Sequence, residues 1–594
     1  MATPPAPPPA RRFLPSRDAL LHAIGPAVIA LFAWLVVVTH LDPGGSDPAS
    51  GEGPGLTIDE SFNVQNGVLL VEAWRSYGIA LVFPESAREV FHPREGVYLN
   101  DHPPLGRFWL GLHHHLAWWW KPPQGSVEPY HPIRSCVTAR ARTGSATAFS
   151  LTILLLGTTA SVWYGRTVGV LTAIMYVSLP RVFGHAHIAS LESFTNLTYT
   201  ATVIAAACAW RETVPSMKTT SWAGAVYGLA LLSKMQAVFI PIPLAVWALW
   251  RWRHRAVLPL IVWGSAALVV FVIGWPTHWF EPWDSIPKYF RGAADRASLS
   301  VWLNGTHYTD KTVPRSYVLI TFLWTVPLVI PVLTVLGVAI KARWLFLNRE
   351  GEAPAEPRWG NTLGIARASA GASPSRDSAE WLVLMEAVFP LIMFSLPRVP
   401  VYDAERLWLP ALPLLVLSAA AGLSRGLAWM QTRAPRWQWG IITATALLLA
   451  LPLLTAWRIA PCYLSSANVA MGGLRAAERS GQELDYWGNS VTRSFLQDVI
   501  RNVPRGSTIA VAPVLHQFQV DDLLQQSPIL RAHEVKLVAY DPKSTTVEYL
   551  LVFRRRADLP SVLEERLRDG PRLAEVTRDG VVLAGLMRAG TEAP

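Results

Sequence analysis

Two adjacent carboxylates, Asp59 and Glu60, stand in the segment Thr57-Ile58-Asp59-Glu60, just before an amphipathic run over 61–77. The segment follows the first long apolar stretch, so both side chains are expected close to a membrane surface. Neighbouring carboxylates raise each other's pKa and can act as a general base or hold a divalent cation. The alternative is an ordinary helix start, because acidic residues favour the first turn. From the pair alone, the helix start is the more frequent explanation.

A second polar segment runs from Asp101 to Arg107 and contains His102-Pro103-Pro104. Consecutive prolines stiffen the backbone, so this turn places an imidazole and a carboxylate beside the aromatic, amphipathic segment that follows. Segments of that kind usually lie in the plane of the membrane interface. Taken alone, the turn has a structural explanation.

Further polar residues occur in loops that the charge pattern assigns to the same side of the membrane. A lysine or arginine in such a loop can neutralise a lipid phosphate and make it a better leaving group. The alternative for the lysine is snorkelling to the interface, and the two explanations are equally weighted. These residues are His185, His187, Glu192, Lys234, His307, Tyr308, Arg398, Asp403, Glu405 and Arg406.

The composition indicates a multi-pass membrane protein. Of 594 residues, 51% are hydrophobic and only 16% are charged, and the mean hydropathy is +0.26. The formal charge of +10 comes from short clusters at alternate ends of apolar runs, which is the positive-inside pattern. We therefore expect no nucleic-acid partner. Cys136, Cys208 and Cys462 are far apart, so neither a disulfide framework nor a metal knuckle is indicated.

The predicted fold is mainly α, with about eleven transmembrane helices and a small C-terminal α/β domain. Residues 1–18 are expected to form a disordered cytoplasmic arm, 19–457 a transmembrane domain and 458–594 a soluble extracytoplasmic domain. The transmembrane domain contains a first outer loop at 42–143 and a cytoplasmic linker at 342–380. The predicted spans are 20–41, 145–164, 168–183, 194–210, 221–233, 236–250, 256–275, 316–340, 381–396, 407–424 and 438–457.

Alternating apolar residues after position 457 predict strands and one helix. The expected strands are 507–511, 535–540 and 547–553, and the expected helix is 559–568. A hairpin of 573–575 with 581–586 is expected around Asp579-Gly580, a dipeptide that favours tight turns.

These motifs, in this order, resemble the integral-membrane glycosyltransferases of the C superfamily. The resemblance rests on Thr57-Ile58-Asp59-Glu60, on Asn100-Asp101-His102-Pro103-Pro104-Leu105-Gly106, and on the run from Gly228 to Lys234. The most similar subgroup is glycosyltransferase family 39, which contains protein O-mannosyltransferases and bacterial aminoarabinose transferases. The resemblance covers residues 20 to 457. It implies a polyprenyl-phosphate-linked sugar as the donor.

The resemblance also implies roles for individual residues. It makes Asp59 the catalytic base, assisted by Glu60. An inverting single displacement is expected from the chemistry, because an acceptor hydroxyl needs a base whereas a polyprenyl phosphate is an adequate leaving group. Lys234 and Arg142 match positions of the family and are expected to bind the donor phosphate, and Arg406 is expected to do so because its loop lies on the same side of the membrane as Lys234. The residues expected on the acceptor side, or shaping the site, are Asp101, His102, Glu192, His307 and Tyr308. The Glu-Lys-Pro-Pro form of the second motif, which supplies a metal ligand in the family, is absent, so a divalent cation is possible but not assigned.

The leading hypothesis is therefore a hexosyl- or pentosyltransferase that acts at the outer face of the cytoplasmic membrane. The acceptor is a glycan, lipid or protein hydroxyl, and the sequence leaves the sugar, the acceptor and the oligomeric state open. One alternative is a transporter or flippase of lipid-linked sugars, a class that usually shows repeated halves or broken mid-membrane helices. Another is a membrane-anchored sensor whose C-terminal domain binds a ligand.

Overall fold

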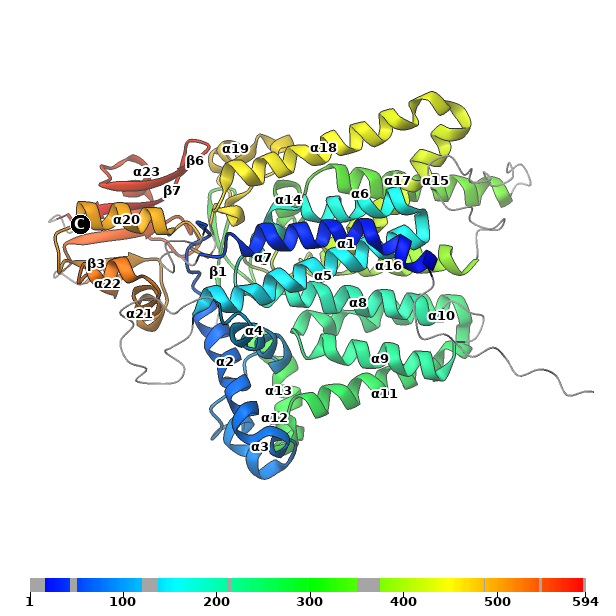
Figure 1. Ribbon diagram of the computed structural model, residues 1–594, viewed down its shortest axis with the longest axis horizontal. Helices are drawn as coiled ribbons and strands as arrows, with labels where there is room; N and C mark the ends of the chain where they lie inside the picture. The colour runs from blue at the N-terminus through cyan, green and yellow to red at the C-terminus, as the bar shows by residue number, and fades with distance from the viewer. Residues whose placement is uncertain are drawn as a thin grey trace, which may run out of the picture.

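A bundle of long helices forms most of the molecule, and a smaller sheet domain covers one end of it (Figure 1). In this computed structural model the described residues are 17–42, 51–119, 137–210, 215–295, 298–349, 374–485, 487–543 and 547–590. Residues 1–16 of the predicted arm and most of the predicted linker at 342–380 lie outside them. The long bundle helices are α1 (Arg17–Val38), α5 (Thr138–Tyr164), α8 (Glu192–Ala209), α9 (Met217–Leu231), α10 (Pro241–Trp252), α11 (Val257–Gly274), α15 (Val329–Arg349), α16 (Pro374–Met393), α17 (Ala411–Arg433) and α18 (Gln438–Ile459).

The protein is a multi-pass membrane protein. Among its described residues, five helical segments are long and apolar enough to cross a membrane, or seven if each bent helix pair is one span. The prediction of eleven spans is not confirmed by this criterion, because several bundle helices are shorter than the roughly 20 residues that a full crossing needs.

Two of the predicted spans, 168–183 and 316–340, are not single straight helices but pairs of helices joined at a sharp bend. The first consists of α6 (Arg166–Val177) and α7 (Pro180–Ala186), which are bent by 74°. The second consists of α14 (Tyr317–Thr325) and α15, which are bent by 111°. Pro180 and Pro327 lie at the breaks, and a proline lacks the N–H that would continue the preceding helix.

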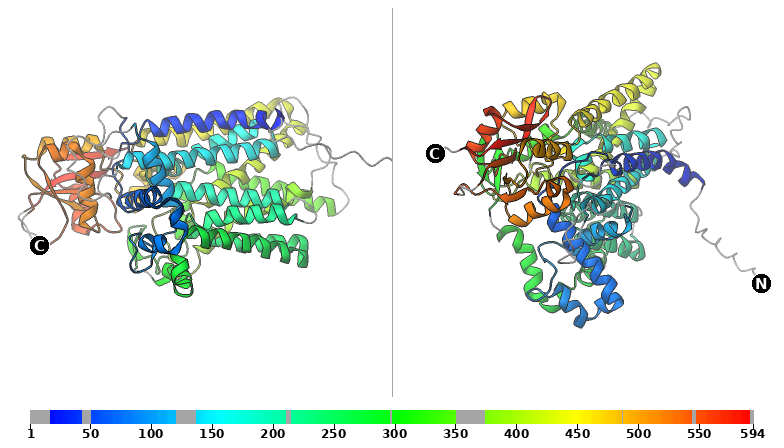
Figure 2. Two further views of the ribbon diagram at one scale, coloured as in Figure 1. Left: turned by 60° about the horizontal axis from the view of Figure 1, so that its bottom comes forward. Right: turned by 60° about the vertical axis from the view of Figure 1, so that its left-hand side comes forward.

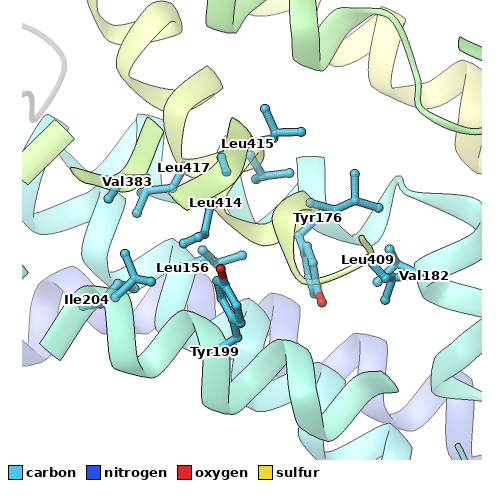
Figure 3. Packing of buried hydrophobic residues seen from close by; sticks show 14 of the residues in the cluster. Leu156, Tyr176, Val182, Tyr199, Ile204, Val383, Leu409, Leu414, Leu415 and Leu417 are labelled. Atoms are coloured by element: carbon cyan, nitrogen blue, oxygen red, sulfur yellow. The ribbon is translucent and has the colours of Figure 1, made fainter. Parts of the chain in front are cut away.

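Buried apolar side chains from several helices pack together in the middle of the bundle (Figure 3). Leu156 of α5, Tyr176 of α6, Tyr199 of α8, Val383 of α16 and Leu414 of α17 are all buried there. Lipid is as apolar as these side chains, so close packing rather than water exclusion holds such helices together. The bundle is therefore a fixed support for the polar loops at its ends.

The described residues between α1 and α5 include three α-helices beside one end of the bundle. They are α2 (Glu60–Tyr77), α3 (Pro84–Phe91) and α4 (Pro104–Leu116). Where α2 crosses α4, a Cβ atom added at Gly111 would lie 1.9 Å from the carbonyl oxygen of Gly67. Only glycine allows this close approach. The crossing fixes the two predicted motifs relative to each other, because one precedes α2 and the other precedes α4.

The chain returns to the same end of the bundle after α11 (Figure 1). There it forms α12 (Thr277–Phe280), α13 (Pro282–Asp295) and the hairpin of β1 (Ser300–Leu303) with β2 (Thr306–Thr309). Figure 2 shows from two further directions that the C-terminal domain covers only this end. These positions agree with the predicted grouping of the loops, while the side of the membrane stays a prediction.

The C-terminal domain is a mixed five-stranded sheet with the strand order β4-β3-β5-β7-β6. β3 pairs in parallel with β4 and β5, while β7 pairs antiparallel with β5 and β6. The small α/β domain is confirmed, with strand positions within a few residues of the predicted ones. The elements are α19 (Gly473–Arg479), α20 (Arg493–Asn502), β3 (Thr508–Ala512), α21 (Gln517–Gln526), α22 (Pro528–Ala532), β4 (Lys536–Ala539), β5 (Tyr549–Phe553), α23 (Ser561–Asp569), β6 (Ala574–Arg578) and β7 (Val581–Arg588).

Candidate active site

Asp59 is the N-cap residue of α2, yet its side chain makes no capping hydrogen bond. Its Oδ2 instead accepts a hydrogen bond from Nη2 of Arg406 at 2.5 Å. The Asp59 side chain remains 27% exposed, whereas Arg406 is 13% exposed. Asp59 therefore stands at a helix start, but its side chain is engaged by Arg406 and not by the helix backbone. Its carboxylate is held by a cation and is still accessible.

Glu60 faces away from Asp59 and is fully buried with Arg142. Both carboxylate oxygens accept from Arg142, each at 2.7 Å, and Oε2 also accepts from the backbone N–H and the hydroxyl of Thr57. The N–H of Ala189 donates to Oε1 at 2.6 Å. Glu60 thus ties the start of α2 to α5 and to the loop before α8.

Arg142 is saturated by this arrangement. Besides Glu60, it donates to the carbonyl oxygens of Asp42, Pro54 and Gly55, so all five of its N–H groups have acceptors. The side chain is 0% exposed. Phosphate binding by Arg142 stays a prediction, but this geometry favours a structural contact instead.

Arg406 is the centre of a cluster of charges. Its Nε donates to Oε1 of Glu192 at 2.9 Å, and its Nη1 donates to Oδ2 of Asp403 at 2.9 Å. Lys234 donates from Nζ to the same Oε1 of Glu192 at 2.5 Å. The structure therefore brings together four predicted site residues, Asp59, Glu192, Lys234 and Arg406, from four separate parts of the chain.

The loop that carries Arg406 has an unusual backbone. Asp403 and Ala404 are consecutive non-glycine residues with positive φ, 54° and 51°. Residues in such conformations cost roughly 1–3 kcal/mol each and persist where the surroundings impose them. The hydroxyl of Tyr317 accepts a hydrogen bond from the N–H of Ala404 at 2.8 Å, and Arg181 pairs with Glu405 at 3.1 Å. These contacts hold the loop, and with it the guanidinium of Arg406.

The loop that carries Lys234 packs against the segment from Asp101 to Arg107. The N–H of Leu105 donates to the carbonyl of Leu232 at 3.0 Å. A Cβ atom at Gly106 would lie 3.0 Å from the carbonyl oxygen of Ser233, so a larger residue would push the two loops apart. Burial lowers the pKa of Lys234, and Glu192 opposes that shift.

Asp101 and His102 lie beside this cluster. Arg107 holds Asp101 through two hydrogen bonds, from Nη1 at 2.6 Å and from Nη2 at 3.1 Å. Burial lowers the pKa of His102 to about 4, with Asp101 opposing the shift and the cations Arg107, Lys234 and Arg406 adding to it. The imidazole is therefore neutral at neutral pH and can donate or accept a hydrogen bond.

His307 and Tyr308 do not enter the charge cluster. His307 is exposed on β2 and forms a hydrogen bond with the carbonyl oxygen of Ala557 at 3.1 Å. Tyr308 is partly buried against the core of the bundle. Their predicted part in shaping the site stays a prediction, and their observed contacts link the β1–β2 hairpin to the C-terminal domain and to the bundle.

Two residues of the C-terminal domain belong to the cluster and were not predicted. The indole ring of Trp487 lies under the Arg406 guanidinium, 4.3 Å from ring centroid to Cζ, and its Nε1 donates to Asp403 at 3.4 Å. Arg555 approaches Asp403 at 3.4 Å. Neither residue stands in a motif, so only the fold reveals them.

The carboxylates do not converge on a common point that suits a metal ion. Asp59 turns to Arg406, whereas Glu60 turns to Arg142. Over the described ranges, no group of three or more His, Cys, Asp or Glu side chains is arranged to hold a metal. The suggested divalent cation between Asp59 and Glu60 is therefore not supported.

Residues 133–280 match the profile of a protein family. That family is described as dolichyl-phosphate-mannose-protein mannosyltransferase. The match extends from just before α5 to the end of α12 and includes Arg142, Glu192 and Lys234. It confirms, over that range, the resemblance to membrane glycosyltransferases. No curated protein matches the sequence significantly.

Two solved structures are similar to the chain over nearly its full length. ArnT from Cupriavidus metallidurans bound to undecaprenyl phosphate has 14% sequence identity and a TM-score of 0.43, and covers 98% of this chain and 100% of its own. The same enzyme in the apo state has 13% identity and a TM-score of 0.42, and covers 96% and 98%.

Proposed function

We propose that this protein is a glycosyltransferase that moves a sugar from a polyprenyl-phosphate donor to an acceptor hydroxyl. The observation that carries the proposal is the accessible Asp59 carboxylate, held by Arg406 next to Lys234. The family match over 133–280 supports the same reaction class. The donor is the lipid-linked substrate, and the acceptor is a glycan, lipid or protein.

In the proposed reaction Asp59 is the base. Its Oδ2 is engaged by Arg406, and Oδ1 has no hydrogen bond among the described contacts, so Oδ1 is the atom that receives the proton. The acceptor oxygen forms a bond to the anomeric carbon as its proton passes to Asp59. The bond from that carbon to the phosphate oxygen breaks, and the polyprenyl phosphate leaves with the electron pair. A single displacement of this kind inverts the anomeric configuration.

Lys234 is the cation best placed to bind the leaving phosphate. Among the described contacts, only one of its three N–H groups is used, in the bond to Glu192. Arg406 uses three of its five N–H groups to hold three carboxylates, so it orients Asp59 and adds positive charge to the site. Positive charge fixed at the leaving oxygen stabilises the negative charge that develops there.

The proposed site faces the end of the bundle that the C-terminal domain covers. By the distribution of Lys and Arg, this end lies at the outer face of the cytoplasmic membrane. A lipid-linked donor reaches that position within the bilayer, and a polar acceptor reaches it from outside.

The test is donor consumption by the purified protein in lipid nanodiscs. The protein is given a panel of undecaprenyl phosphate sugars and an extract of the cell envelope, and free undecaprenyl phosphate is measured by mass spectrometry. We expect free undecaprenyl phosphate to be released only when Asp59 is present. The sugar should be attached to an acceptor, with its anomeric configuration inverted relative to the donor. Movement of intact donor across vesicle membranes without its consumption would instead identify a flippase.

A further inference from the structure

The segment just before Asp59 packs in the hydrophobic core of the C-terminal domain. Leu56 and Ile58 are buried in the same apolar cluster as Ile509 and Val511 of β3 and Leu551 of β5. This cluster is the core on one face of the sheet. A segment of the predicted first outer loop thus completes the core of a domain that lies more than 400 residues further along the chain.

Both backbone polar groups of Ile58 are also satisfied by that domain. The N–H of Ile58 donates to the carbonyl oxygen of Trp487 at 3.3 Å. The carbonyl oxygen of Ile58 accepts from Nε2 of Gln519 at 2.8 Å. Because this carbonyl belongs to the peptide group that joins Ile58 to Asp59, the Gln519 amide fixes the plane from which the Asp59 side chain departs.

Contacts continue on the other side of Asp59. The hydroxyl of Ser61 donates to Oδ2 of Asp522 at 2.6 Å. Phe62 packs edge-to-face against Phe518, with the ring centroids 4.7 Å apart. Asp59 is therefore flanked on both sides by residues that contact the start and middle of α21.

We propose that Gln519 is a positioning residue for the transfer reaction, and that α21 sets the direction of the Asp59 carboxylate toward the acceptor. This inference rests on the proposed function of Asp59. By this inference the C-terminal domain takes part in catalysis and is not a separate ligand-binding sensor.

One substitution separates positioning from helix capping. Gln519 accepts hydrogen bonds at Oε1 from the N–H groups of Leu515 and His516, and these bonds cap α21. Gln519→Glu keeps carboxylate oxygens for both caps and removes the Nε2 donor to Ile58. Gln525→Glu is the matched control, because it makes the same chemical change on the same helix at a half-buried residue with no described bond to residues 57–62.

The experiment measures donor consumption and amide hydrogen exchange of the full-length variants in nanodiscs. Gln519→Glu should lower kcat by ~10- to 100-fold, since small misplacements of reacting groups have effects of this size, and leave KM for the undecaprenyl phosphate sugar within about threefold. Exchange at the peptide that contains Ile58 and Asp59 should rise. Gln525→Glu should match the wild type in both measurements.

The possible failures are distinguishable. If Asp59→Asn is inactive while Gln519→Glu keeps the wild-type kcat, the positioning role is overturned and the proposed function stands. If Gln519→Glu loses folded protein, or raises KM as much as it lowers kcat, then Gln519 is only a structural residue. If the wild type consumes no donor, or Asp59→Asn consumes it normally, the proposed function itself falls.

Discussion

Arg406 donates to Asp59 across 2.5 Å although 347 positions separate the two residues. The same guanidinium also bonds to Glu192 and Asp403, so one planar side chain sets the positions of three carboxylates. The candidate base is thus oriented by a loop that itself has two residues in the left-handed conformation.

Two substitutions of Arg406 distinguish the effect of its positive charge on activity from the effect of its planar shape. Arg406→Ala removes both and should abolish measurable donor consumption. Arg406→Lys keeps the charge, but a single ammonium group cannot span three carboxylates as the planar guanidinium does, so its activity should lie between the alanine variant and the wild type. Steady-state kinetics of the two variants give the comparison. Equal activity in the wild type and both variants would show that Arg406 has no role in the reaction.

Lys234→Ala should weaken binding of the donor and leave the protein folded. The expected change is a large increase in KM for the undecaprenyl phosphate sugar, because the only ammonium group described in the cluster is lost. Lys218→Ala is the control, since Lys218 is exposed at the start of α9. If both alanine variants had the same kinetics as the wild type, phosphate binding by Lys234 would be excluded.

The ion pair between Arg142 and Glu60 should affect stability more than chemistry. Both side chains are fully buried, and removal of one partner from a buried pair costs about 3–5 kcal/mol because the other charge is left without compensation. Arg142→Met should therefore lower the unfolding temperature in detergent strongly. The double variant Glu60→Gln, Arg142→Met should recover part of the loss. A stable Arg142→Met protein with a raised KM for donor would favour phosphate binding instead.

The sequence predicted best what depends on local patterns. The hairpin around Asp579-Gly580 was correctly placed, since both residues take the positive φ, 46° and 75°, that their types favour. The prolines at 180 and 327 stand in the sequence, but apolar runs continue through them, so the breaks were not predicted. Asp59, Glu192, Lys234 and Arg406 were singled out because short motifs and loop positions mark them, and their side chains do contact one another.

The contribution of the C-terminal domain was not predictable in the same way. Trp487 and Gln519 stand in no motif, and their contacts with Arg406 and Ile58 join segments hundreds of positions apart. Glu60 and Arg142 were both singled out, but their pairing depends on how α2 meets α5. Such pairings come from tertiary packing, which one sequence does not encode in its local periodicity.

Acid should destabilise the protein partly through His114. The N–H of Val137 donates to Nε2 of His114 at 3.0 Å, and burial lowers the pKa of this histidine to about 3. An unfolded histidine has a pKa near 6.5, so from about pH 6.5 down to 3 the unfolded state binds a proton that the folded state does not. The free energy of unfolding therefore falls as the pH falls through this window.

His114→Gln offers an acceptor oxygen to Val137 without a titrating group. Thermal unfolding of the variant between pH 7 and pH 4.5 should consequently show a smaller loss of stability than that of the wild type. His254→Gln, at an exposed position, is the control and should follow the wild type. An unchanged pH dependence in His114→Gln would show that this histidine does not contribute.

The most direct test of the account is the rate of sugar transfer by Asp59→Asn in a single turnover with undecaprenyl phosphate sugar in nanodiscs. Asparagine has the same shape but is not a base, and positioned proton transfer is worth about a hundred- to ten-thousand-fold in rate. We expect the rate to fall at least a hundredfold in Asp59→Asn, with donor binding and folding retained, and to fall less in Glu60→Gln. Near-normal transfer by Asp59→Asn would contradict this expectation.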